Sequence, residues 1–238
     1  MMINKPLHQQ IKEDLLNKIE YEDYKVGDKI PNEVDLATHY KVSRPTVRQA
    51  INALVIDGFL ERRKKRGTIV RQRKINQEFT HVIESYNDEM TRKGLIPKTK
   101  VLSLKSEVAN EEVMQQLELK PGESVYKLVR LRYAEEDPIV LVTTYIPLSL
   151  VPNLKEIDFT TTRFYEVLEK NQTPIKEITR KLELITADET VSDLLSVEID
   201  APLFYFHSVG YIEDHVPIEY SVSKYRGDLN SFIFNISS

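Results

Sequence analysis

The chain has 238 residues, of which 41% are hydrophobic and 29% charged, as in an ordinary globular protein long enough for two domains. No apolar run approaches the length of a membrane span, and the first residues, MMINKPLHQQ, lack the pattern of a signal peptide. We therefore expect a cytoplasmic protein with no membrane partner. The absence of cysteine excludes disulfides and thiolate metal ligands, and the five histidines are scattered, so we expect neither a metal site nor a cofactor.

The charge of the chain is divided unevenly along its length. Residues 1–75 contain 16 Lys and Arg and 10 Asp and Glu, whereas residues 76–238 contain 17 and 27. With a net charge of −4, the whole chain is a poor match for nucleic acid on average. A basic first part joined to an acidic second part is the distribution expected if the first part alone meets phosphate.

Residues 27–58 have the pattern of two helices joined by a short turn. Asn32 can cap a helix that extends to Tyr40, with Asp35 three residues further on, close to a capping box. Ser43 can cap a second helix that ends at Gly58. One face of this helix is apolar at helical spacing, with Val47, Ala50, Ile51, Leu54 and Val55. The opposite face presents Arg44, Thr46, Arg48, Gln49 and Asn52.

Residues 59–70 have the pattern of a β-hairpin with a basic tip. A short strand begins at Phe59, residues 62–66 read RRKKR, and the chain returns through Gly67 to Val70. Two helices followed by a basic hairpin form a winged helix-turn-helix, which places its second helix in the major groove and its hairpin beside phosphates and a minor groove. Taken singly, each part has a plainer interpretation: a core stripe, a solvated basic face, a soluble loop, and a tight turn with positive φ at Gly67.

Residues 72–78, within the polar stretch RQRKINQE, lack apolar periodicity, and we interpret them as a linker between a first domain (1–71) and a second domain (79–238). In the second domain, we expect helices over residues 79–93, 110–117, 164–170 and 188–195. We expect strands over residues 98–108, 125–133, 139–146, 175–186, 203–212, 217–225 and 231–236. Hairpins separated by short helices predict an antiparallel sheet with helices packed on it, so the fold class is α+β.

The first domain resembles the DNA-binding domain of the GntR family of bacterial transcription regulators. The family pattern stands here as Ile30-Pro31-Asn32-Glu33, Val42-Ser43-Arg44-Pro45-Thr46-Val47-Arg48-Gln49-Ala50 and Gly67-Thr68-Ile69-Val70. One departure is Val34, where many members carry an arginine that helps to contact DNA. The resemblance implies DNA contacts from Asn32, Glu33, Ser43, Arg44, Thr46, Arg48, Arg66 and Gly67, the last of which would approach the minor groove.

The second domain resembles the UTRA effector-binding domain of the HutC subfamily of these regulators, which is similar in fold to chorismate lyase. The recognisable pieces are Gly94-Leu95-Ile96-Pro97, Arg130-Leu131-Arg132, Thr162-Arg163-Phe164-Tyr165 and a closing segment, residues 219–228, that reads EYSVSKYRGD. The closing segment is the most specific of these. Together, the two resemblances cover the whole chain.

Arg130 and Arg132 lie two residues apart on a strand and therefore point to the same face. Two guanidinium groups on one face repel each other unless an anion or carboxylates join them, and the arginine fork suits phosphate or carboxylate. The alternative is an ion pair with Glu219 or another acid at the sheet surface. The resemblance implies that these arginines hold the phosphate of an amino-sugar phosphate, while Glu219 and Tyr225 meet the sugar. The expected effector-binding residues are Ser85, Tyr86, Asn87, Arg130, Arg132, Thr161, Thr162, Glu219 and Tyr225.

These features predict a transcription regulator that responds to a ligand. Its partners would be double-stranded operator DNA and a small-molecule effector, of which a phosphorylated sugar is the first candidate. The family resemblance implies that a homodimer binds a near-palindromic operator. We expect a repressor of a carbohydrate uptake or catabolic operon, whose DNA-binding heads are reoriented or disordered by the effector. The alternatives are a carboxylate effector, an activator, an architectural DNA-binding protein without effector, and a chorismate lyase-like enzyme. Against the enzyme, the sequence has no nucleophile–base pair and no cofactor loop.

Overall fold

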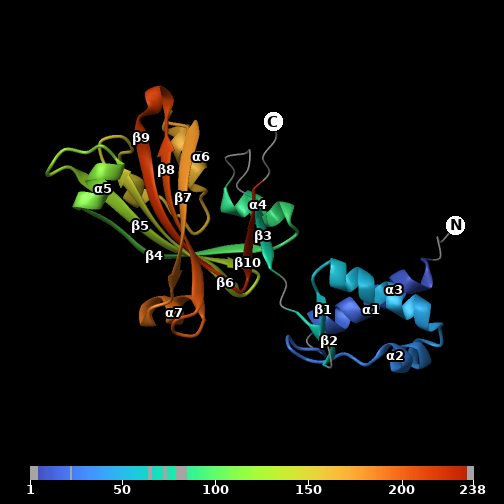
Figure 1. Ribbon diagram of the computed structural model, residues 1–238. Helices are drawn as coiled ribbons and strands as arrows, with labels where there is room; N and C mark the ends of the chain where they lie inside the picture. Colours follow the sequence, from blue (N-terminus) through green and yellow to red (C-terminus); the bar gives the residue numbers. More distant parts are fainter. Residues whose placement is uncertain (1–4, 22, 64–65, 72–73, 79–84, 235–238) are drawn as a thin grey trace. The chain divides into compact units, whose positions relative to one another are not determined.

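The computed structural model describes residues 5–21, 23–63, 66–71, 74–78 and 85–234, and the chain divides into two compact units, residues 1–75 and 76–238 (Figure 1). Each unit has a hydrophobic core of its own, so each is described by itself. Within the described ranges, no helix has both the length and the apolar character needed to cross a membrane.

Unit 1, where it is described, contains helices followed by a hairpin. The elements are α1 (Leu7–Glu20), α2 (Glu33–Tyr40), α3 (Arg44–Ile56), β1 (Leu60–Arg63) and β2 (Gly67–Val70). Asn32 caps α2, because its side-chain oxygen accepts hydrogen bonds from the backbone N–H groups of Val34 and Asp35 at 2.9 and 3.0 Å. Ser43 caps α3 in the same way. β1 and β2 pair antiparallel, so the predicted winged helix-turn-helix is confirmed.

The core of unit 1 is formed by the inward faces of its helices and the start of the hairpin. Leu15 of α1 and Val47 and Leu54 of α3 are fully buried. Burial of such side chains stabilises the fold by about 1.5–3 kcal/mol each relative to leaving them exposed. The predicted apolar stripe of α3 is the face that packs inward, and this leaves the opposite, arginine-bearing face in solvent.

Unit 2 is built on a six-stranded sheet in which every neighbouring pair runs antiparallel. The strand order is β4-β5-β6-β9-β8-β7. Pairing of β6 with β9 joins two sets of three consecutive strands, β4 to β6 and β7 to β9, into one sheet. The predicted α+β fold, with an antiparallel sheet in the second domain, is therefore confirmed. The strands are β4 (Pro97–Val108), β5 (Ser124–Ala134), β6 (Asp137–Pro147), β7 (Glu177–Thr186), β8 (Pro202–Tyr211) and β9 (Pro217–Arg226).

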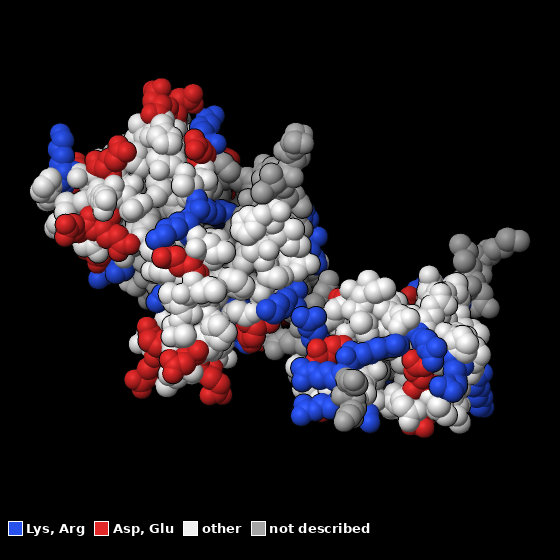
Figure 2. All heavy atoms as spheres, in the orientation of Figure 1, with Lys and Arg blue, Asp and Glu red and all other residues white. Residues whose placement is uncertain are grey.

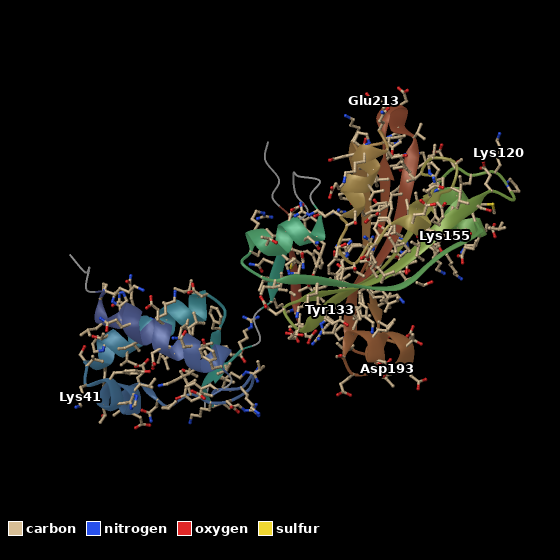
Figure 3. All side chains as sticks on the ribbon, turned by 180° about the vertical axis from the view of Figure 1, so that it is seen from behind. Lys41, Lys120, Tyr133, Lys155, Asp193 and Glu213 are labelled. Atoms are coloured by element: carbon tan, nitrogen blue, oxygen red, sulfur yellow. The ribbon has the colours of Figure 1, made fainter. Side chains whose placement is uncertain are left out.

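The helices of unit 2 cover opposite faces of this sheet (Figure 1). One face carries Leu128 and Ile146 and packs against α6, whereas the other packs against α5 and α7. Figure 3 labels Asp193 on α7 and Glu213 at the β8–β9 turn, which lie at opposite ends of the sheet. The helical elements are α4 (Tyr86–Arg92), α5 (Glu111–Gln116), α6 (Phe164–Lys170) and α7 (Glu189–Leu195), with single 3-10 turns η1 (Leu154–Glu156) and η2 (Glu213–His215).

Part of the expected linker is a strand. β3 (Ile75–Glu78) pairs with β10 (Asn230–Ile233), and the fully buried side-chain amides of Gln77 and Asn230 are hydrogen-bonded at 2.9 Å. The interpretation of residues 72–78 as linker is therefore wrong for residues 75–78. The polar side chains of β3 give no alternating apolar pattern, and the residue that pairs with Gln77 lies 153 positions further along the chain.

Two other expected elements are described only in part. The helix expected over 79–93 is described from Tyr86, where Ser85 caps it, and residues 79–84 lie outside the described residues. The last strand, expected over 231–236, is β10, which ends at Ile233, and residues 235 and 236 also lie outside the described residues.

The Arg-Gly-Asp part of the closing segment fastens the end of β9 to α7. Arg226 is buried; its Nε and Nη2 donate to the Asp228 carboxylate at 3.1 and 2.7 Å, and its Nη1 donates to the carbonyl of Leu195 at 3.2 Å. A Cβ on Gly227 would lie 2.5 Å from the carbonyl oxygen of Pro202. This stretch therefore has a structural role, because its charged groups are satisfied within the fold.

Candidate nucleic-acid interface and ligand cavity

The basic side chains of unit 1 gather on its solvent-exposed surface, whereas Asp and Glu gather at the ends of unit 2 (Figure 2). Arg44 and Arg48 are exposed in the first half of α3, and Arg62 and Arg66 are exposed on the hairpin. Base-edge contacts in helix-turn-helix proteins come from the N-terminal part of the second helix, where the first two of these arginines lie. The surface therefore has the charge and the shape to bind a DNA groove.

Two of the predicted DNA-binding side chains are engaged in helix capping. Besides accepting from the backbone of α2, Asn32 donates from Nδ2 to the Asp35 carboxylate at 2.6 Å. The Ser43 hydroxyl accepts from the Thr46 N–H at 3.4 Å and lies 2.8 Å from the Thr46 hydroxyl. These contacts fix the start of each helix, and they leave the Ser43 hydroxyl exposed beside Arg44.

Glu33, which the sequence also assigned to DNA, contacts two arginines. Its Oε2 accepts from Nε and Nη2 of Arg48 at 2.9 and 2.8 Å, and its Oε1 accepts from Nη2 of Arg62 at 3.0 Å. The hydrogen bond from Arg48 lowers the pKa of Glu33, and the charges of Arg48 and Arg62 lower it further. The carboxylate is therefore ionised at neutral pH and joins α3 to the hairpin.

Gly67 opens β2 at the turn of the hairpin with a φ of 94°, so the positive φ expected of a tight turn is present. A Cβ at this position would also lie 2.7 Å from Cε of Lys29. The positive φ thus disfavours a side chain independently of DNA, whereas the flexible end of Lys29 could move aside. Approach of Gly67 to a minor groove stays a prediction. Arg66 precedes it and is exposed, and residues 64 and 65 lie outside the described residues.

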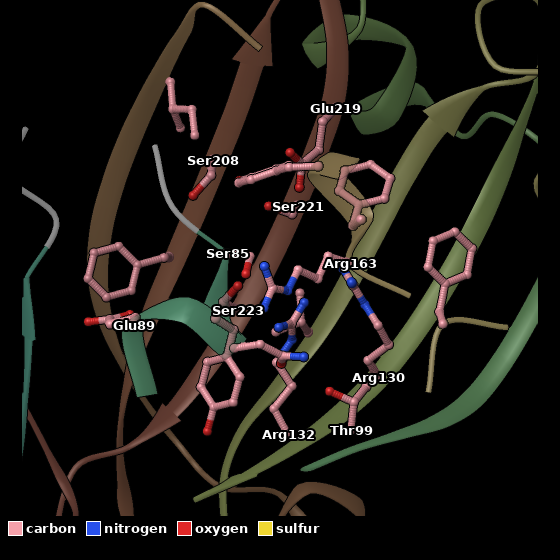
Figure 4. Close-up of a pocket in the computed structure, with 18 of the residues that line it drawn as sticks. Ser85, Glu89, Thr99, Arg130, Arg132, Arg163, Ser208, Glu219, Ser221 and Ser223 are labelled. Carbon is pink, nitrogen blue, oxygen red and sulfur yellow. The ribbon is translucent and has the colours of Figure 1, made fainter. Parts of the chain in front are cut away.

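Unit 2 has a cavity on the face of the sheet that packs against α6 (Figure 4). Cross-strand register builds its floor: Arg130 on β5 lies opposite Val142 on β6, which lies opposite Ser223 on β9. A second row joins Arg180 on β7, Ser208 on β8 and Ser221 on β9. Residues of α4 and α6, with the segment before α6, complete the walls.

The structure brings most of the predicted effector-binding residues together in this cavity. Thr161 does not line it: its side chain is exposed, and its Oγ1 lies 3.5 Å from the Asp158 carboxylate. Its neighbour Thr162 faces the cavity instead, so of two adjacent threonines only one points inward. The predicted residues that line the cavity are Ser85, Tyr86, Asn87, Arg130, Arg132, Thr162, Glu219 and Tyr225.

Arg130 and Arg132 both turn their guanidinium groups into the cavity (Figure 4). Nη2 of Arg130 donates to the Thr144 hydroxyl at 2.9 Å, and the two guanidinium carbons lie 5.5 and 5.0 Å from the ring centres of Phe164 and Tyr86. Within the described part of the chain, neither arginine has an ion pair within 4.0 Å, and both buried Nε atoms lack a hydrogen-bond partner. The alternative of an ion pair with Glu219 is therefore not what the structure contains.

Burial controls the ionisation of the charged groups in the cavity. It lowers the pKa of Arg130 to about 9, with a further lowering from the charge of Arg132, and it also lowers the pKa of Arg132. Burial raises the pKa of Glu219, although the nearby charge of Arg130 opposes this, and it raises the pKa of Tyr225 to about 12. Arg130 thus remains charged at neutral pH, in surroundings that do not solvate it well.

The cavity carries an excess of positive charge. Arg130, Arg132, Arg163 and Arg180 line it, against Glu89 and Glu219. Glu89 is paired with Lys93 at 2.5 Å, and Arg163 is paired with Asp88 at 2.9 Å. The balance favours an anionic ligand, and the lining hydroxyl groups favour one that also forms several hydrogen bonds.

Sequence reasoning missed several residues of the cavity. Ser221 and Ser223 lie between Glu219 and Tyr225 at a spacing of two, so strand alternation alone points all four to one face. Arg180 and Ser208 carried no such signal, because their place depends on which strands pair and in which register. The additional polar residues are Glu89, Thr99, Arg163, Tyr165, Arg180, Ser208, Ser221 and Ser223.

A winged helix-turn-helix with an exposed basic face, joined to a unit with a ligand cavity, defines a DNA-binding regulator of transcription. Residues 7–70 match the model of the bacterial regulatory proteins of the gntR family, and residues 92–229 match the model of the UTRA domain. The chain belongs to the GntR family, with a UTRA domain as its second unit. It is a transcription regulator and not an enzyme.

Full-length relatives agree with this assignment. The chain is 29% identical over 237 residues to the HTH-type transcriptional repressor NagR of Bacillus subtilis, covering 98% of this chain and 97% of NagR. It is 29% identical over 227 residues to the mannosyl-D-glycerate transport/metabolism system repressor MngR of Escherichia coli, covering 95% and 94%. The crystal structure of PhnF from Mycobacterium smegmatis superposes with a TM-score of 0.80 at 27% identity, covering 96% of this chain and 99% of PhnF.

Proposed function

We propose that the protein represses a carbohydrate uptake or catabolic operon and leaves its operator when a phosphorylated sugar or amino sugar binds in the cavity of unit 2. The observation that carries this proposal is the pair Arg130 and Arg132 in the cavity. Arg130 is buried and Arg132 half-buried, both Nε atoms lack a partner, and no carboxylate within the described residues is paired to either. A dianionic phosphate satisfies both guanidinium groups, because their donors form a fork that matches its oxygens.

The rest of the cavity suits the remainder of such a ligand. Glu219, Ser221, Ser223 and Tyr225 alternate along β9 and face the cavity, which Ser85 before α4 and Thr162 before α6 also line. Hydroxyl and carboxyl groups at this density bind a polyol better than an apolar molecule. The name of the relative MngR, a repressor of a mannosyl-D-glycerate transport/metabolism system, also supports a sugar-related effector.

We further propose that the protein binds its operator as a homodimer, with each α3 in a major groove, on two half-sites about one helical turn apart. An effector that favours a different arrangement of the heads weakens operator binding, and linkage requires that the operator weaken effector binding by the same factor.

A thermal-shift screen tests the effector. The purified protein is heated with hexose phosphates, free hexoses and small carboxylates, each in parallel with the Arg132→Met variant. We expect stabilisation by phosphorylated sugars alone, lost in the variant, and weaker operator binding in the presence of the same compounds. Stabilisation by carboxylates instead would replace the sugar phosphate with a carboxylate metabolite. Silence across all three classes, in a folded protein that binds DNA, would refute the proposal.

A further inference from the structure

Glu33 lies at the centre of a cluster that joins three elements of unit 1. It opens α2, Arg48 lies on α3, and Arg62 lies on β1 of the hairpin. The carboxylate divides its two oxygens between them: Oε2 accepts from Arg48 at 2.8 and 2.9 Å, and Oε1 accepts from Arg62 at 3.0 Å. No other carboxylate in the described part of unit 1 is paired with an arginine of α3.

The exposure of the three side chains shows which of them face outward. The side chain of Glu33 is 20% exposed, whereas those of Arg48 and Arg62 are 53% and 47% exposed. The acid therefore lies beneath the two guanidinium groups, which present their remaining donors to solvent. Val34, the next residue of α2, is apolar and exposed, so α2 contributes no cation here and the positive charge comes from α3 and the hairpin.

The hydrogen bonds constrain what Arg48 can present to DNA. Glu33 uses Nε and one hydrogen of Nη2, which leaves the Nη1 end of the guanidinium free. The Nη1–Nη2 edge can still bond two acceptors, as on the major-groove edge of a guanine. An unrestrained arginine would have to lose its rotamer freedom on binding, whereas Arg48 is held before it meets DNA.

We propose that Glu33 is a positioning residue rather than a DNA contact, and that it aligns Arg48 and Arg62 so that the α3 arginine reads a base while the hairpin arginine binds the adjacent backbone phosphate. This assigns a DNA contact to Arg62 in particular, which the sequence placed only within the basic tip, residues 62–66. The inference rests on the DNA-binding function of unit 1. Two arginines on one acid leave a net positive charge, so the cluster still attracts phosphate.

The test uses variants of Glu33 that separate the effect of its negative charge from the effect of its side-chain length. The operator is first recovered by selection of random duplexes on the wild-type protein, and each variant is then titrated with that duplex and with a scrambled one. Glu33→Gln removes the negative charge, and Glu33→Asp keeps it on a side chain too short to hold both arginines. Glu61→Gln is the matched control, because Glu61 is an acid of the hairpin that pairs with Arg63 at 2.5 Å and has no part in the cluster.

We expect opposite changes on the two duplexes. Glu33→Gln should bind the scrambled duplex more tightly, since an acid near phosphate is gone, but should bind the operator roughly tenfold more weakly, since Arg48 is no longer aligned. Glu33→Asp should weaken the operator alone. Glu61→Gln should strengthen both, and Arg62→Ala should weaken both and reduce the salt dependence of binding by about one counterion.

Three results would overturn the inference. Equal strengthening on both duplexes in Glu33→Gln, as in the control, would show that Arg48 needs no alignment. Weaker operator binding in Glu33→Gln with full affinity restored in Glu33→Asp would indicate that the carboxylate itself contacts DNA. An unchanged salt dependence in Arg62→Ala would remove the hairpin contact. Failure of the selection to recover any duplex would instead contradict DNA binding by unit 1.

Discussion

Unit 1 and unit 2 both use arginines, but they hold them in opposite states. Arg48 is about half exposed and already paired with Glu33, whereas Arg130 is 3% exposed and its Nε has no partner within the described residues. An exposed, paired arginine costs the fold little, so the DNA-facing surface keeps its shape without DNA. A buried, unpaired guanidinium is costly, because its charge is taken out of water without full compensation. Without a ligand, the uncompensated charge thus lowers the stability of unit 2. An anion that binds in the cavity should compensate this charge and stabilise unit 2 itself.

The largest effect that tests this contrast is the loss of ligand stabilisation in Arg132→Met. A ligand at 100 times its dissociation constant adds about 2.7 kcal/mol to the free energy of unfolding. We expect this gain to vanish in the variant, while its unliganded melting temperature stays equal or rises, because an apolar chain replaces a half-buried cation whose Nε has no partner. The equivalent change on the DNA-facing surface, Arg48→Met, should leave the gain intact. A variant that melts several degrees lower without ligand would contradict the contrast.

Arg226 sharpens the comparison from within unit 2, because it is buried with its donors satisfied. Arg226→Met removes its hydrogen bonds to Asp228 and to the carbonyl of Leu195. We expect the variant to lose about 2 kcal/mol of unfolding free energy in a urea titration. Ligand binding to the remaining folded protein should be unchanged. If Arg132→Met lost as much stability as Arg226→Met, the two arginines would not differ in the way proposed.

Ser43 separates folding from DNA binding in unit 1. Ser43→Ala removes the cap of α3 and should lower the stability of unit 1 by about 1 kcal/mol, measured by hydrogen exchange of the α3 amides. Ser43→Asp keeps a capping oxygen and should preserve that protection. It also places a carboxylate toward phosphate and should weaken operator binding roughly tenfold. Full operator affinity in Ser43→Asp would place Ser43 away from the DNA.

The smallest effect concerns acid stability. Because Arg48 lowers the pKa of Glu33 below the value of about 4.5 that the unfolded chain has, the carboxylate stabilises unit 1 above that pH. This contribution is lost as the pH falls through the lowered pKa of the folded protein. Glu33→Gln should therefore remove part of the decline in α2 and α3 amide protection below pH 4.5. Parallel declines in the two proteins would show that the pair does not contribute to stability.

The sequence predicts the local parts of this fold well. The apolar stripe of α3 and the turns around residues 135–138 and 213–215 depend on neighbours in the chain, and each is where the pattern places it. β3 was missed because its partner is distant and its side chains are polar. A strand whose buried residue is an amide such as Gln77 gives no alternating apolar pattern.

The same distinction holds for the cavity. Arg130, Arg132, Glu219 and Tyr225 could be predicted because strand alternation orients them and the family resemblance gives them a role. Arg180 could not, since only the pairing of β7 with β8, and of β8 with β9, brings it to the same face. The choice between Thr161 and Thr162 depends on one backbone turn before α6, which a sequence pattern does not resolve.

The pairing of β3 with β10 sets an order for folding during synthesis. Unit 1 is complete once its own residues have left the ribosome, since its core uses neighbouring segments only. β3 emerges next, but Gln77 cannot meet Asn230 until a further 153 residues have been made, which takes roughly 8–30 s at bacterial rates of about 5–20 residues per second. A DNA-binding head is therefore folded on each nascent chain well before the domain that is to control it can close.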